Sequence, residues 1–375
     1  MIKDTKLNYA LNVAARWAVG LVFLFSSFVK GVDPMGTMFK VHDYMSSWQL
    51  FGMTFEWAHP LAGFLAVSLI CAEFLEGVLL ITNAFRLFSS WLLALMMTFF
   101  TVTTFIDATT NLVNDCGCFG DAVKLTNWQT FWKNIALDVP TVWIVLTRNM
   151  RRKRRFERDG IWFIFAIAAM LVFCVYNIKH EPVIDFRPWK VGNVMMDMSA
   201  DATPKSYVTY KSLKSGETME FESSKLMEYM ADPEWVKEWE WQSSRVEMPD
   251  VKAPGFSMLD LSGEDHAVEL IPAEEGLLIV TIHHLADVGK NGAEEVKNAL
   301  TLGEESGTKV VVLSSALPEE MQEWLEEHEI GDVELYFADA TAIETMMRGN
   351  PGFMYLKDAV VIDKKRTVSE LDIEN

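Results

Sequence analysis

Long runs of apolar residues fill the first half of the chain and are missing from the second half. Five runs, at residues 9–29, 60–82, 86–106, 131–147 and 160–178, have the roughly 17 to 25 residues that cross a bilayer as a helix. The first run stays apolar for a full span without a small-residue cleavage site behind it, so we expect a retained helix rather than a signal peptide. The pattern predicts an α-helical membrane bundle of about five transmembrane helices over residues 1–180.

Polar residues between the runs predict two local features. Residues 33–37 break the chain after the first run, and residues 38–51 mix apolar and polar positions at helical spacing, as in a short helix lying along a membrane surface. Further on, Thr126 or Asn127 is a candidate N-cap for the run at 131–147. The segment around residue 118 should therefore form a turn held between two membrane helices.

The second half alternates shorter elements. Residues 181–248 are interpreted as a connector, with a hairpin over 207–221 that turns at Ser215-Gly216 and a Trp-rich helical patch around Trp235, Trp239 and Trp241. Beyond it, strands at 277–282 and 309–313 alternate with helices at 293–302 and 318–328. Such alternation predicts a soluble α/β domain over residues 249–375.

Charge separates the two halves as clearly as hydropathy does. The formal net charge is −19, and residues 181–375 carry 40 of the 52 acidic side chains. An acidic soluble half argues against nucleic acid or anionic lipid as its partner. A basic cluster lies between the fourth and fifth runs, and the positive-inside rule assigns it to the cytoplasm; its members are Arg148, Arg151, Arg152, Lys153, Arg154, Arg155 and Arg158. The N-terminus is then cytoplasmic, and residue 118 and the C-terminal domain face the periplasm.

The cysteines supply the candidate chemistry. Of four, Cys71 and Cys174 lie inside apolar runs, where cysteine usually serves as a small packing residue. Cys116 and Cys118 are separated only by Gly117, and a disulfide across one residue is strained, which favours labile or catalytic chemistry. Lys133 and Lys124 lie close enough in sequence to stabilise a thiolate. A structural disulfide or two idle thiols remain alternatives, whereas zinc would need further His or Cys ligands nearby.

Ionisable residues inside the apolar runs form a second candidate set, because a charge in hydrocarbon requires a partner or a role. Counting depth at 1.5 Å per residue places Arg16 level with Glu73, with Glu76 one turn below, and places Lys30 and Asp107 together near the cysteine turn. These residues lock the bundle as ion pairs, or else Glu73 and Glu76 line a proton route or quinone site, with Asp138 as a further candidate. The histidines of this half lie near span ends, so haem is a poor fit.

At this point the first half resembles a known family. The segments 28–34, 73–77 and 115–121, the last containing Cys116, Cys118 and Asp121, are similar to the DoxX/MauE group of small bacterial membrane proteins over roughly residues 5–150. The resemblance implies disulfide formation or maturation of exported proteins, and the DoxX name implies an association with quinol oxidation. Chains that join such a domain to a C-terminal extracytoplasmic domain resemble Bacteroidetes proteins.

The C-terminal half resembles extracytoplasmic thioredoxin-like domains at residues 253–263 and 350–356, where the resemblance implies a cis proline at Pro351. At the position of the Cys-x-x-Cys motif this chain has His283 and His284, and no cysteine follows Cys174. Adjacent residues on an extended segment point to opposite faces, so we do not expect a metal there. The domain is predicted to be a degenerate thioredoxin-like module that docks a partner through His283, His284 and Pro351.

These observations favour an inner-membrane thiol-disulfide redox or maturation factor for exported proteins. A diffusible quinone is the candidate electron acceptor, and an envelope redox protein or an exported thiol protein is the candidate partner. The alternative is a non-enzymatic envelope scaffold or assembly factor with a structural Cys116/Cys118 pair. A small-solute transporter is disfavoured, because no matched pair of broken helices occurs.

Overall fold

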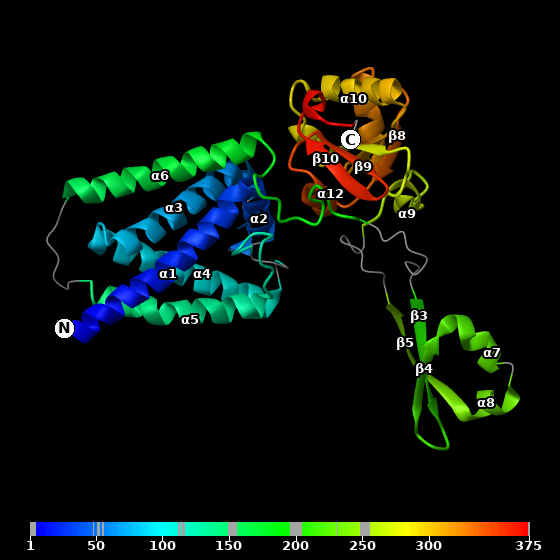
Figure 1. Cartoon of the computed structure of the whole chain (residues 1–375), viewed down its shortest axis with the longest axis horizontal. Coiled ribbons are helices and arrows are strands. Elements are labelled where there is room, and N and C mark those ends of the chain that lie inside the picture. Colours follow the sequence, from blue (N-terminus) through cyan, green and yellow to red (C-terminus); the bar gives the residue numbers. More distant parts are fainter. Residues whose placement is uncertain are drawn as a thin grey trace. The chain divides into compact units, whose positions relative to one another are not determined.

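The computed structural model describes residues 5–47, 49–50, 53–54, 56–111, 113, 117–148, 156–195, 205–230, 232–247 and 256–373. The chain divides into two compact units, Met1–Phe186 and Arg187–Asn375. The first is a helical bundle with one short two-stranded sheet, and the second contains the five-stranded and the three-stranded sheet (Figure 1).

Four helices of the described part are long and apolar enough to cross a membrane. They are α1 (Lys6–Val32), α3 (Ala62–Thr82), α4 (Arg86–Thr110) and α6 (Phe156–Lys179). The expectation of five such helices is wrong, because the run at 131–147 corresponds to α5 (Asn127–Leu146), which carries Gln129, Lys133, Asn134 and Asp138. These polar residues lower the mean hydropathy of α5.

Helix α5 nevertheless extends along the bundle, antiparallel to α4. At its start Asn127 donates to the carbonyl of Asp107, near the end of α4, over 3.3 Å. At its end the carbonyl of Thr147 accepts from Arg86, the first residue of α4, over 2.5 Å. The predicted N-cap is confirmed at Thr126, whose hydroxyl accepts from the Gln129 N–H in a capping box.

Short elements connect α1 to α3. Helix α2 covers Pro34–Ser47, so it begins and ends earlier than the expected 38–51; β1 (Gln49–Leu50), β2 (Met53–Thr54) and the 3-10 helix η1 (Glu56–Leu61) follow it. Tyr44 donates to Asp107 over 2.6 Å. This hydrogen bond fixes α2 to the C-terminal end of α4.

Two glycines set the register between α1 and α3. A Cβ on Gly77 would lie 3.0 Å from the carbonyl oxygen of Gly20, so only glycine lets the two backbones come this close. The crossing places Arg16 beside the carbonyl of Leu80. It also places Ser26, nearly three turns beyond Arg16 on α1, beside Glu73.

The second unit is built on a five-stranded sheet of order β10-β9-β6-β7-β8. Its strands are β6 (Leu277–Ile282), β7 (Lys309–Ser314), β8 (Glu334–Phe337), β9 (Gly352–Lys357) and β10 (Val360–Lys365). Strands β6, β7 and β8 are parallel, whereas β9 is antiparallel to both β6 and β10. The prediction of strand 277–282 is confirmed, and that of strand 309–313 is one residue short.

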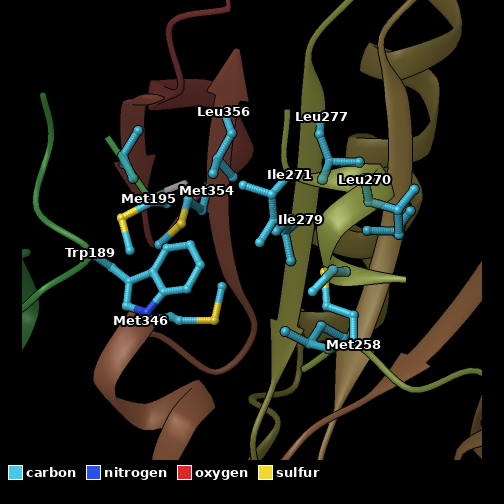
Figure 2. Close-up of a cluster of buried hydrophobic side chains, with 14 of the residues drawn as sticks. Trp189, Met195, Met258, Leu270, Ile271, Leu277, Ile279, Met346, Met354 and Leu356 are labelled. Atoms are coloured by element: carbon cyan, nitrogen blue, oxygen red, sulfur yellow. The ribbon is translucent and has the colours of Figure 1, made fainter. Parts of the chain in front are cut away.

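Helices and short turns surround this sheet. They are α9 (Ala267–Leu270), η3 (Leu285–Asp287), α10 (Gly292–Ser306), α11 (Pro318–Glu327), α12 (Ala340–Met346) and η4 (Val368–Glu370). A buried cluster around Ile279 on β6 joins the sheet to Met258 and Met346 (Figure 2). Trp189 and Met195 belong to the same cluster. Their segment was expected to be a connector, but it is part of the domain built on this sheet.

The rest of the second unit contains a three-stranded sheet of order β4-β3-β5. Its strands are β3 (Lys205–Ser212), β4 (Thr218–Glu222) and β5 (Trp239–Glu247), and η2 (Ser223–Lys225), α7 (Leu226–Met230) and α8 (Pro233–Glu238) lie between β4 and β5. The expected hairpin is confirmed, with Gly216 at a φ of 73° in its turn. The Trp-rich patch is only partly helical, because Trp239 and Trp241 lie on β5.

Candidate functional site

Cys118 lies on a tight turn of the first unit. The Gly120 N–H donates to the Gly117 carbonyl over 3.0 Å, and both glycines have positive φ, 61° and 50°, which favours glycine over other residues. Cys116, the predicted partner of Cys118, lies outside the described residues. Asp121 follows the turn and is half-buried.

Side chains of α1 and α5 hold this turn in place. The hydroxyl of Ser26 donates to the Cys118 carbonyl over 2.8 Å. The ring of Phe119 lies 5.4 Å from that of Phe25, measured between centroids. The ammonium of Lys133 lies 4.4 Å above the centre of the Phe119 ring, which is within the range of a cation–π interaction.

A buried ion pair lies behind the turn. Lys30 Nζ is 2.5 Å from Glu73 Oε1, and the two side chains are only 7% and 2% exposed. Ser26 Oγ lies 2.9 Å from the other oxygen of Glu73, Oε2, as well as 2.8 Å from the Cys118 carbonyl. One serine hydroxyl therefore connects the buried carboxylate to the backbone of the cysteine turn.

This pair corrects the depth argument from sequence. The structure pairs Glu73 with Lys30, while Arg16 donates to the Leu80 carbonyl over 3.2 Å. Asp107, expected beside Lys30, accepts from Tyr44. The predicted pairs were wrong for a physical reason. Helix α1 is three residues longer at each end than the apolar run, so depths counted from the ends of the run are displaced. The register of α1 against α3 is set by the contact between Gly20 and Gly77.

The remaining intramembrane carboxylates have separate partners. Glu76 is fully buried and accepts from Ser89 over 2.6 Å. Asp138 accepts from Thr101 over 2.9 Å. Neither residue lines the cavity that contains Cys118. The structure therefore does not bring Glu76 and Asp138 to the cysteine turn.

A small cavity joins the turn to the ion pair. Cys118, Lys30 and Glu73 line it together with Lys133 and Asn134. Its volume of about 30 Å³ has room for about two waters, so we place no quinone in it. Ser26 and Asn134 were missed from sequence, although Ser26 lies four residues before Lys30 and thus on the same face of α1.

In the second unit, the two histidines lie at the end of β6. The His283 N–H donates to Asn350 Oδ1 over 3.2 Å, and Asn350 Nδ2 donates to the His284 carbonyl over 2.6 Å. The following Asn350–Pro351 bond is cis, as expected. The three predicted docking residues His283, His284 and Pro351 are thus brought together.

The two histidines do not diverge as the sequence argument expected. Their ligand nitrogens and a carboxylate oxygen of Glu344 lie within 4.8 Å of one another, because β6 ends at Ile282 and the alternation of a strand no longer applies. His283 is buried, and burial together with the charges of His284, Arg348 and Arg366 lowers its pKa to about 4. The nearby guanidinium groups oppose a bound cation.

Comparison with known proteins finds one similarity, and it lies in the first unit. Residues 8–147 match the model of a family described as "Methylamine utilisation protein MauE". Neither a curated protein nor a solved structure gives a significant match. The four apolar helices indicate a membrane protein, and over residues 8–147 the first half of this chain is similar to that family.

The ion pair predicts a specific pattern of stability. Glu73→Leu leaves the Lys30 ammonium buried without its carboxylate and should destabilise the bundle by about 3 to 5 kcal/mol, whereas Lys30→Met combined with Glu73→Leu should recover most of this loss. Thermal and denaturant unfolding of the detergent-solubilised chain measures both. Asp43→Asn, at the partly exposed Lys40–Asp43 pair, serves as control and should change stability by less than about 1 kcal/mol. A double variant no more stable than Glu73→Leu would contradict the pairing.

His283 predicts a pH dependence for the second unit. Its pKa falls from 6.5 to about 4 on folding, so the unfolded state binds the additional proton between these values and stability declines as pH falls from 6.5 to 4. The loss should be on the order of 3 kcal/mol. Hydrogen exchange of β6 peptides measures it in the full chain.

Two variants isolate this contribution. His283→Gln should remove most of the difference between pH 6.5 and 4, while His284→Gln, at a side chain that is 47% exposed, should retain it. Equal pH dependence in the wild type and His283→Gln would refute the assignment.

Proposed function

We propose that this MauE-like membrane protein passes oxidising equivalents to exported proteins through Cys116 and Cys118. The observation that carries the proposal is the seating of Cys118 on a glycine-bounded turn whose cavity also contains Lys30, Glu73 and Lys133. Cations near a cysteine favour the thiolate form. Lys133 supplies such a cation, while Lys124 is exposed and does not line the cavity.

The proposed reaction is thiol–disulfide exchange. A thiolate of the partner attacks one sulfur of the Cys116–Cys118 disulfide, which breaks that bond, forms a mixed disulfide and releases the other cysteine as thiolate. The second thiol of the partner then loses its proton and attacks the mixed disulfide. The partner leaves oxidised, and this chain is left with two thiols. A membrane quinone that accepts two electrons and two protons restores the disulfide.

The arrangement of the bundle supports a periplasmic site. Ser26 near the end of α1 contacts the Cys118 turn, and Asn177 near the end of α6 donates to the Gly31 carbonyl over 3.1 Å. At the opposite end, Asn12 donates to Thr147 over 2.6 Å, just before the basic segment 148–158. If that basic end is cytoplasmic, the Cys118 turn and the chain leaving α6 face the periplasm of the bacterial inner membrane.

For the second unit we propose a degenerate thioredoxin-like domain that docks the partner. The arrangement β7-β6-β9-β10, with β9 and β10 antiparallel to each other, supports this fold. His283 and His284 stand at the end of the central strand, beside Pro351. Because no cysteine follows Cys174, the domain contributes binding and not thiol exchange.

The rival function is a non-enzymatic envelope scaffold or assembly factor, in line with the methylamine-utilisation description of the family. Two contacts favour it, the hydrogen bond from Ser26 to the turn and the ion pair behind it, because a purely structural role also accounts for both. In that case Cys116 and Cys118 would hold the turn without changing redox state.

A trapping experiment separates the two functions. In a Cys71→Ala/Cys174→Ala background, Cys118→Ala should leave Cys116 joined to an envelope protein in a mixed disulfide that dithiothreitol releases. Non-reducing electrophoresis of cells quenched with an alkylating reagent measures this. The control is the same background with Cys116→Ser and Cys118→Ser, which should trap nothing and lose function. Full function in that double serine variant would favour the scaffold.

A further inference from the structure

Two cysteines outside the candidate site meet inside the bundle. Cys71 on α3 and Cys174 on α6 are far apart in the sequence, yet both belong to one apolar cluster between the two helices. Cys174 is fully buried, and Cys71 packs against it in one apolar cluster with Ile70 and Met170. The four cysteines of the chain thus fall into two pairs, one close in sequence and the other close in space.

Helix α6, which carries Cys174, is closely packed in the bundle. Buried residues of α6 recur at helical spacing on the face that contains Cys174, from Ala166 through Met170 to Asn177. Asn177 donates to the carbonyl of Gly31 on α1. A Cβ on Gly31 would come within 2.9 Å of the Met170 sulfur, so α6 is closely fitted against α1 as well.

We propose that Cys71 and Cys174 form a reversible disulfide that joins α3 to α6. Two S–H bonds break and one S–S bond forms, with the release of two electrons and two protons. A lipid-soluble quinone accepts all four and becomes a quinol. The surroundings point to an oxidant of this class, because Val67, Phe74 and Phe173 complete the cluster and an apolar environment excludes charged, water-soluble oxidants.

Oxidation of Cys71 and Cys174 would fix the position of α3 relative to α6. Glu73 lies two residues after Cys71 on α3, and α6 leads out of the bundle towards the second unit. The disulfide would therefore covalently link the helix that carries the buried carboxylate to the helix that precedes the second unit. This inference does not depend on the chemistry of Cys116 and Cys118.

A cleavage assay tests the pair directly. The full chain with Cys116→Ala and Cys118→Ala, and with a protease site inserted between α5 and α6, is reconstituted in vesicles and treated with a short-chain benzoquinone. After cleavage, non-reducing electrophoresis should show the two fragments joined, and dithiothreitol should separate them. Alkylation under denaturing conditions should show loss of label from both thiols.

One control tests the position of the thiol on α6, and another tests the class of oxidant. Cys174→Ala combined with Val175→Cys moves the thiol to an adjacent, 41% exposed position, about 100° around the helix, and should leave the fragments separate. Fragments that separate in the parent protein after quinone treatment, with both thiols still alkylated, would overturn the disulfide. Equal oxidation by a membrane-impermeant oxidant would overturn the quinone assignment.

Discussion

The buried contact between Lys30 and Glu73 is the interaction on which the first unit depends. Neither side chain reaches water freely, and a single charge at that depth would be strongly unfavourable. The ammonium therefore fixes the position of the carboxylate, and the carboxylate joins α3 to α1. Through Ser26 the same carboxylate is connected to the turn that carries Cys118. An ion pair that stabilises the bundle thus also determines where the thiol lies.

The ion pair can form because the backbones of α1 and α3 lie close together. Gly20 and Gly77 let α1 and α3 come close enough for a lysine near one helix end to reach a carboxylate further down its neighbour. Other polar groups of the bundle follow the same rule of local pairing, as with Tyr44 and Asp107. A membrane interior without water favours such pairs, because each unsatisfied polar group is expensive there.

Much of this architecture could be predicted from the sequence, and the failures have definite causes. Apolar run length predicted five membrane helices, of which four are long and apolar enough in the described part of the structure, and turn chemistry predicted the hairpin at Gly216 and the N-cap at Thr126. The ion-pair partners between helices were predicted wrongly. Counting residue depth along each helix does not include the contact of Gly20 with Gly77, which shifts α1 along α3. For the same reason the packing of Cys71 with Cys174 could not be predicted. It depends on which faces of two remote helices meet.

The central claim is that Cys116 and Cys118 cycle between dithiol and disulfide. Titration of the purified Cys71→Ala/Cys174→Ala chain in glutathione redox buffers, with the two states quantified by mass after alkylation, tests it most directly. The account predicts a reversible two-electron transition with a midpoint above about −300 mV, the range of labile rather than structural disulfides. A pair that stays oxidised or stays reduced across the whole range of buffers would contradict it.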